Sequence, residues 1–104
     1  MPLLTVISGG PDAGKSLIQD ALMALKPMDY ALVARDRVRP TLCGPVDEGV
    51  LTHVLLAMAE TLLNSGLNVL AVAQNQEPKD RERWLDVAQR AGTPLRWVSV
   101  ELLA

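Results

Sequence analysis

The sequence predicts an α/β fold, with a small parallel sheet of about four strands and helices on both of its faces. Short apolar runs alternate with longer segments whose apolar residues recur every three to four positions, which indicates the order β-α-β-α-β-α-β. The chain has 104 residues, of which 49% are apolar, and this suits one domain with one core. We therefore expect residues 1–104 to form a single domain.

Four short apolar runs are the expected strands. They lie at residues 3–8, 30–34, 68–73 and 95–100, and each is followed by a polar residue or glycine. Strands joined through helices run parallel and are buried on both faces, which explains why these runs are predominantly apolar. In such a sheet the ligand site lies at the carboxyl ends of the strands.

The first two expected helices have recognisable ends. The first begins near Lys15 and is stopped by Pro27, because proline cannot donate the backbone hydrogen bond that a helix interior needs. The second follows Asp47, whose side chain can cap a helix, and ends at Gly66, the residue type favoured just past a helix C-terminus. We expect Val50 to belong to the apolar face of the second helix.

The third expected helix starts at Pro78 and ends at Gly92. Proline is common at the first position of a helix, where its missing N–H would have no partner in any case. Trp84, Leu85 and Ala88 are expected to lie together on the buried side of this helix.

The segment between the first strand and the first helix reads GGPDAGKS, residues 9–16, and matches the phosphate-binding pattern G-x-x-x-x-G-K-[ST] in full. Glycines let successive backbone N–H groups turn toward one phosphate, and the N-terminus of the following helix favours the same anion. Lys15 can reach the β- and γ-phosphates, and the Ser16 hydroxyl can bind Mg²⁺. The predicted nucleotide-binding residues are Gly9, Gly10, Pro11, Asp12, Ala13, Gly14, Lys15, Ser16 and Leu17.

A second motif, ARDRVR at residues 34–39, directly follows the second strand. Its position brings Asp36 to the same sheet edge as the phosphate-binding loop, where a carboxylate can accept a proton from an attacking hydroxyl. Arg39 shares a face with Asp36 if a helical turn forms, and its guanidinium can hold an acceptor phosphate through two contacts. Arg35 is a further candidate for binding an acidic acceptor. The alternative is a charged, solvated loop.

The stretches VISGGPDAGKS, VARDRVR and LNVLAVAQNQEPKDRERW together resemble the kinase domain of phage-type 5′-polynucleotide kinases and their P-loop kinase relatives. This resemblance implies a three-layer P-loop NTPase fold that binds ATP, or another NTP, with Mg²⁺. It implies that Lys15 and Ser16 act on the nucleotide phosphates, that Asp36 is the catalytic base, and that Arg39 holds the phosphate of the acceptor.

The sequence departs from that family in two places. After the third strand the family often carries an acid and a polar residue, whereas this chain has AQNQ at residues 73–76. The acid is missing, and Asn75 is the candidate for the polar, acceptor-binding role. The family also continues into a lid that bears an arginine, and this chain ends at Ala104. A transition-state arginine is worth about 10³ to 10⁵ in rate. We therefore expect slow catalysis unless a neighbouring subunit supplies the arginine.

Composition excludes some function classes. The net charge is −2 and only two Trp and one Tyr are aromatic, which argues against a general nucleic-acid coat or a base-stacking platform. No apolar stretch is long enough to span a membrane, and the N-terminus lacks a basic segment before its apolar run. The single cysteine, Cys43, fits a reducing compartment, so we expect a cytoplasmic protein.

The leading hypothesis is an ATP- and Mg²⁺-dependent phosphotransferase that acts on the 5′-hydroxyl of DNA or RNA. Lys15, Asp36 and Arg39 would be its catalytic residues. Two alternatives stay open: a nucleotide-binding module with weak or no catalysis that acts through a partner or as a homo-oligomer, and a kinase for a nucleoside or small metabolite. An open edge of the short sheet is compatible with self-association.

Overall fold

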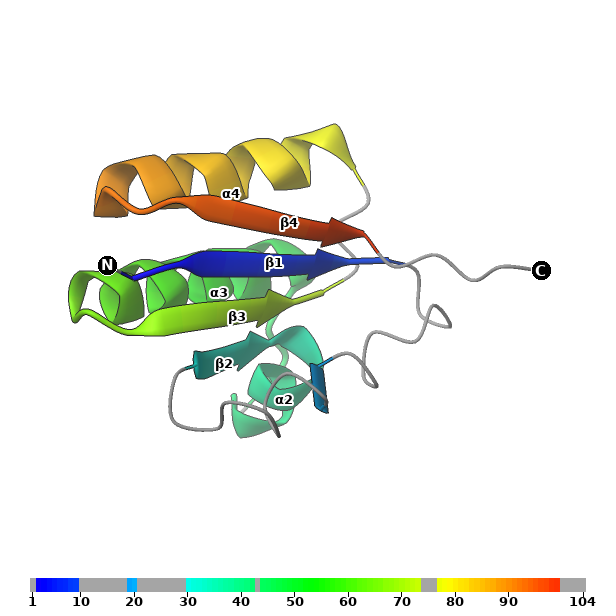
Figure 1. The fold of residues 1–104 in the computed structure, drawn as a ribbon. Helices are drawn as coiled ribbons and strands as arrows, with labels where there is room; N and C mark the ends of the chain where they lie inside the picture. The colour runs from blue at the N-terminus through cyan, green and yellow to red at the C-terminus, as the bar shows by residue number, and fades with distance from the viewer. Residues whose placement is uncertain (1, 10–18, 21–29, 43, 74–76, 100–104) are drawn as a thin grey trace.

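The computed structural model of the chain describes residues 2–9, 19–20, 30–42, 44–73 and 77–99. Its sheet has four parallel strands in the spatial order β2-β3-β1-β4 (Figure 1). The strands are β1 (Leu4–Ser8), β2 (Tyr30–Ala34), β3 (Asn68–Val72) and β4 (Leu95–Ser99). The predicted α/β class and the parallel sheet of four strands are thus confirmed.

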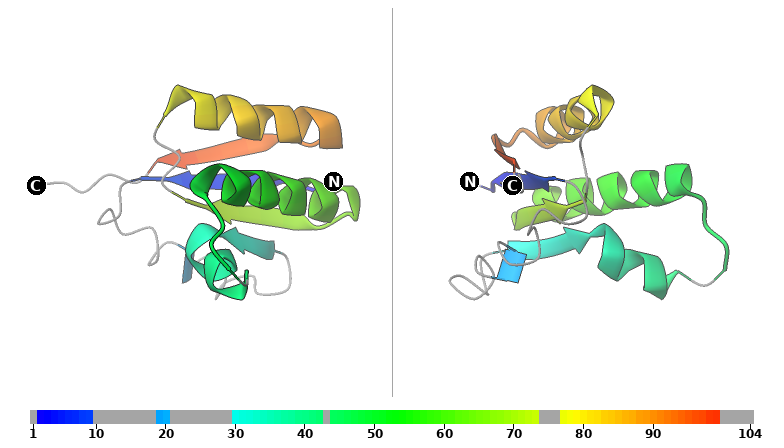
Figure 2. Two further views of the ribbon diagram at one scale, coloured as in Figure 1. Left: turned by 180° about the vertical axis from the view of Figure 1, so that it is seen from behind. Right: turned by 90° about the vertical axis from the view of Figure 1, so that its right-hand side faces the viewer.

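The described helices lie between the strands in the chain. They are α2 (Arg35–Val38), the 3₁₀ turn η1 (Arg39–Thr41), α3 (Glu48–Asn64) and α4 (Pro78–Ala91). The right-hand view of Figure 2 shows α3 and α4 on the same face of the sheet. The expected first helix lies mostly outside the described residues, but Gln19 and Asp20 within it are helical and Gln19 is buried.

The main core lies between the sheet and the two long helices. One cluster joins alternate residues of the strands to the inner faces of α3 and α4, and its members include Val6, Ala71, Leu55 and Trp84. A second cluster lies on the other face of the sheet and comprises Ile7, Ala34, Leu70 and Val72. Burial on both faces explains why β1 and β3 are predominantly apolar, whereas the partly exposed β4 carries Arg96 and Ser99.

The predicted ends of α3 and α4 are confirmed. The Asp47 side chain accepts a 2.8 Å hydrogen bond from the backbone N–H of Val50, as expected of an N-cap. Gly92 follows the last residue of α4 with φ +67°, a left-handed conformation that glycine adopts without steric cost.

Two apolar positions differ from the prediction. Val50 and Leu85 are expected on buried helix faces, yet they are 49% and 41% exposed. On α4 the buried side instead consists of Trp84, Val87 and Ala88. Neighbouring helix residues are rotated by about 100°, so Trp84 turns toward the sheet while Leu85 turns away from it. None of the helices that the structure describes is long and apolar enough to cross a membrane.

Candidate active site at the carboxyl edge of the sheet

The phosphate-binding motif begins at the carboxyl end of the central strand β1. Ser8 is the last residue of β1 and is buried, and the buried Gly9 follows it. Ser8 pairs with Ser99 in the parallel ladder between β1 and β4, and their hydroxyl oxygens lie 3.4 Å apart. The other predicted loop residues, 10–17, lie outside the described residues, and so does Asn75. Their roles stay predictions.

The second motif forms the helical turn on which its interpretation depends. α2 starts directly after β2, and the backbone N–H of Arg39 donates to the Arg35 carbonyl. Arg39 has φ −50° and ψ −49°, so the right-handed turn continues through it. Asp36 and Arg39, three positions apart, therefore lie on one face of the turn. Both residues are exposed, whereas Val38 is buried and anchors the turn to the core.

A glutamate that sequence reasoning missed joins this turn to α3. The Glu48 carboxylate forms ion pairs with two arginines: its Oε2 lies 2.5 Å from Arg35 Nη1, and its Oε1 pairs with Arg39 Nη2. Glu48 is the first residue of α3, where a negative charge is favourable beside the N-terminal end of the helix dipole. An acid in the first turn of a helix is common, so no sequence signal marks this contact.

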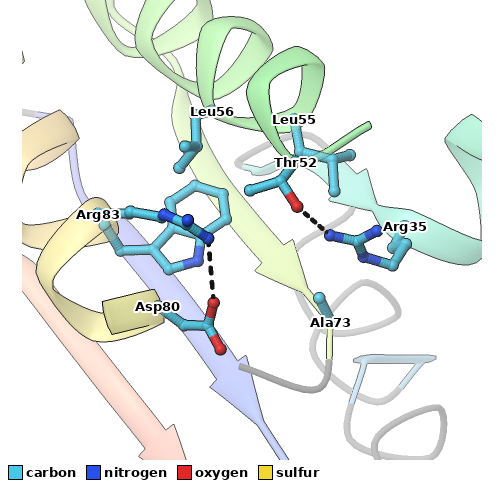
Figure 3. A pocket seen from close by; sticks show the side chains of 8 residues that line it. Arg35, Thr52, Leu55, Leu56, Ala73, Asp80 and Arg83 are labelled. Atoms are coloured by element: carbon cyan, nitrogen blue, oxygen red, sulfur yellow. Dashed lines mark hydrogen bonds and ion pairs between the residues drawn. The ribbon is translucent and has the colours of Figure 1, made fainter. Parts of the chain in front are cut away.

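Arg35 is held by α3 through a second partner. Its Nη2 donates to Thr52 Oγ1 at 2.5 Å, as Figure 3 shows, and the Thr52 hydroxyl in turn donates to the Glu48 carbonyl at 2.9 Å. Glu48 and Thr52 are four residues apart on α3, so Arg35 lies across successive turns of one helix face. The Arg35 side chain is 23% exposed, compared with 46% for Arg39. Arg39 is thus the more accessible of the two cations.

A small pocket lies beside this cluster, between α3, α4 and the end of β3. Arg35 and Thr52 line one side, and Asp80 and Arg83, 3.5 Å apart as an ion pair, line the opposite side (Figure 3). Its volume of about 20 Å³ suits a water molecule and is far too small for a nucleotide. The remaining lining residues are Leu55, Leu56, Ala73 and Trp84.

Among the residues that the structure describes, no group of three or more His, Cys, Asp or Glu side chains is arranged to hold a metal ion. The residue predicted to bind Mg²⁺, Ser16, lies outside them. Its hydroxyl is a hard oxygen donor of the kind that Mg²⁺ prefers, alongside phosphate oxygens and water. The residue type therefore fits a magnesium ion that is carried by a nucleotide.

Comparison with known protein families gives one match to the sequence. A family model described as an AAA domain matches residues 4–102, which is nearly the whole chain. No curated protein matches the sequence.

Several solved structures share the fold. A chain in a structure of the Pnkp1/Rnl/Hen1 complex matches 98% of this chain with a TM-score of 0.83 and 20% identity. A candidate kinase from Chloroflexus aurantiacus matches 95% with a TM-score of 0.76 and 21% identity. APS kinase CysC from Mycobacterium tuberculosis matches 95% with a TM-score of 0.74 and 18% identity. This chain spans 36%, 59% and 75% of those three chains, respectively.

Proposed function

This chain belongs to the AAA domain family and has the fold of the P-loop kinases, and from that premise we propose that it transfers the γ-phosphate of ATP to the 5′-hydroxyl of a polynucleotide. One observation carries the proposal. Asp36 and Arg39 are exposed on one face of a helical turn, at the same sheet edge where the phosphate-binding motif begins. A base and an anion-binding group thus lie together where an acceptor is expected.

The roles follow from the chemistry of each side chain. The Asp36 carboxylate takes the proton of the 5′-hydroxyl as its oxygen bonds to the γ-phosphorus, and the bond from that phosphorus to the β–γ bridging oxygen breaks to release ADP. Lys15 and the loop N–H groups stabilise the charge on the phosphates. Ser16 would hold Mg²⁺, which supplies further neutralisation of phosphate charge when bound.

Arg39 supports a polynucleotide as the acceptor. The Arg39 guanidinium lies one helical turn from the proposed catalytic base, Asp36, and can bind a phosphate close to the reacting hydroxyl. The 5′-terminal nucleotide of a strand carries such a phosphate. The matched structures also include one described as the Pnkp1/Rnl/Hen1 RNA repair complex, with a TM-score of 0.78. RNA repair is the description of that complex, and it is a reason to test RNA ends as well as DNA ends as acceptors for this chain.

A small-molecule acceptor is the second candidate. The match to APS kinase favours it, because this chain spans 75% of that protein. The two candidates differ in what should bind near Arg39: an internal phosphodiester of a strand, or an anionic group of a small molecule.

Transfer of labelled γ-phosphate from ATP to competing acceptors tests the proposal. The acceptors are 5′-hydroxyl DNA, 5′-hydroxyl RNA, nucleosides and APS, each offered alone and in mixtures. Preferential labelling of an oligonucleotide supports the proposal, and preferential labelling of a small acceptor favours the second candidate. Nucleotide binding with no transfer to any acceptor would instead favour a binding module that acts through a partner.

A further inference from the structure

Glu48 links both arginines of the second motif to the N-terminus of α3. Its two carboxylate oxygens are divided between them, with Oε2 on Arg35 and Oε1 on Arg39. The two arginines are four residues apart and lie at the start of α2 and of η1. One carboxylate therefore spans the whole turn that carries Asp36.

The glutamate is itself held in place by local structure. The Asp47 side chain caps α3 directly before it, and the Thr52 hydroxyl bonds to its backbone carbonyl. Thr52 also accepts from Arg35, so Arg35 contacts α3 at two points. This arrangement is a connected network, which holds side chains more firmly than an isolated surface ion pair does.

We propose that Glu48 is a positioning residue that presents the Arg39 guanidinium to the acceptor phosphate, an inference that rests on the proposed function. A free arginine side chain loses rotamer entropy when a ligand fixes it. The ion pair with Glu48 already restricts the Arg39 side chain before the acceptor arrives. Less entropy is then lost on binding, so the acceptor phosphate binds more tightly than it would to an unrestricted Arg39.

The geometry leaves Arg39 able to bind a phosphate. Glu48 contacts Arg39 through Nη2, whereas the guanidinium also carries donors at Nε and Nη1. The side chain of Arg39 is 46% exposed, so solvent and ligands reach it. Glu48 can therefore orient Arg39 while other donors of the guanidinium contact the acceptor.

The opposite role would be competition, in which the Glu48 carboxylate occupies the place of the acceptor phosphate. Positioning and competition predict changes of opposite sign when the charge of Glu48 is removed. Glu48→Gln should raise the acceptor KM if Glu48 positions Arg39, and should lower it if Glu48 competes.

The test measures separate KM values for ATP and for a 5′-hydroxyl oligonucleotide in the full chain. We expect Glu48→Gln to raise the oligonucleotide KM about fivefold, the upper end of the contribution of an exposed ion pair, while the ATP KM changes by less than about twofold. Glu60→Gln is the matched control, because Glu60 lies on the same helix and pairs with Arg90 at 2.9 Å. It should change neither constant. A Glu48→Gln oligonucleotide KM equal to or below that of the wild type would overturn the proposal.

Two further measurements separate positioning from a general structural effect. In an Arg39→Ala background, Glu48→Gln should have no additional effect on the oligonucleotide KM, because the group that it positions is gone. Melting temperatures of both Glu→Gln variants check that folding is unchanged. An equal effect of Glu48→Gln in both backgrounds would contradict the role assigned to Glu48.

Binding of a fluorescent 5′-hydroxyl oligonucleotide, followed by anisotropy, distinguishes the failure of this inference from failure of the proposed function. If the wild type transfers phosphate but Glu48→Gln leaves the acceptor constants unchanged, only the role of Glu48 is wrong. If the wild type binds oligonucleotide without transferring phosphate, the activity is wrong and the dissociation constants still test Glu48. If it neither binds nor modifies an oligonucleotide, both proposals fail.

Discussion

Asp36 and Arg39 share one face of the helical stretch that directly follows β2, and both side chains are open to solvent. The two residues share a face because a continuous right-handed turn runs from Arg35 through Arg39. The buried Val38 packs in the core and anchors this turn. The first two predictions separate the roles of these two residues, because one should act on chemistry and the other on acceptor binding.

Replacing Asp36 by Asn should abolish phosphoryl transfer and leave nucleotide binding nearly unchanged. The amide cannot accept the hydroxyl proton, and general-base catalysis typically contributes about 10²- to 10⁴-fold in rate. Transfer of labelled phosphate to a 5′-hydroxyl oligonucleotide measures the first effect, and titration with a fluorescent ATP analogue measures the second.

The matched control for Asp36→Asn is Asp86→Asn, which makes the same change at an exposed position in the middle of α4. It should leave the transfer rate within about twofold of the wild type, because surface substitutions away from special features have small effects. Wild-type rates in Asp36→Asn would show that another group is the base.

Replacing Arg39 by Ala should raise the acceptor KM by about tenfold or more, since hydrogen bonds to charged groups contribute about 1.5–3 kcal/mol each. Arg39→Lys should recover only part of this, because an ammonium lacks the planar pair of donors. The effect should vanish for a nucleoside acceptor that has no phosphate. Arg90→Ala, which removes the ion pairs that Arg90 in the last turn of α4 forms with Glu60 and Asp86, serves as the control.

Trp84 and Leu85 are adjacent on α4 but should differ widely in their contribution to stability. Trp84 is 4% exposed and belongs to the main core, so Trp84→Ala should lower the free energy of unfolding by about 3–5 kcal/mol. Leu85→Ala should cost only about 1 kcal/mol, because Leu85 is already 41% exposed and loses less buried apolar surface than Trp84 does. Urea denaturation followed by circular dichroism measures both, and equal losses would contradict the buried side assigned to α4.

Gly92→Ala should destabilise the fold by about 1 kcal/mol through the backbone alone. Gly92 has φ +67°, and a Cβ placed there meets nothing within 4 Å, so strain in the left-handed conformation is the cost. Gly92→Asn should cost less than Gly92→Ala, because asparagine tolerates this conformation better. Thermal melts of the three proteins rank them, and a melting temperature of Gly92→Ala equal to that of the wild type would refute the role of this turn.

Local sequence signals predicted most of the fold correctly. The apolar run at 30–34 and the proline at position 78 marked β2 and the start of α4 where the structure has them. The sequence predicts a helix cap at Asp47 and a helix end at Gly92, and the structure confirms both. These signals succeed because capping, turn formation and apolar periodicity depend on residues only a few positions apart.

The helix faces were predicted less well. Val50 and Leu85 are apolar and lie beside core positions in the sequence, yet nearly half of each residue is exposed. Periodicity indicates that a helix has a buried side, but the sheet and the neighbouring helix decide where that side begins and ends. The packing of α3 against α4 and the sheet decides which helix residues are buried. Such contacts between distant segments cannot be derived from a local sequence pattern.

The sequence by itself determined the order of strands and helices, the phosphate-binding motif, and the position of Asp36 and Arg39 at the end of a strand. Only the tertiary structure decided the strand order β2-β3-β1-β4 and the pairing of Glu48 with Arg35 and Arg39. It also brought the Ser8 and Ser99 hydroxyls within 3.4 Å of each other. The physical reason is that strand order and helix docking depend on apolar burial summed over the whole sheet, and contacts between distant segments follow from that docking.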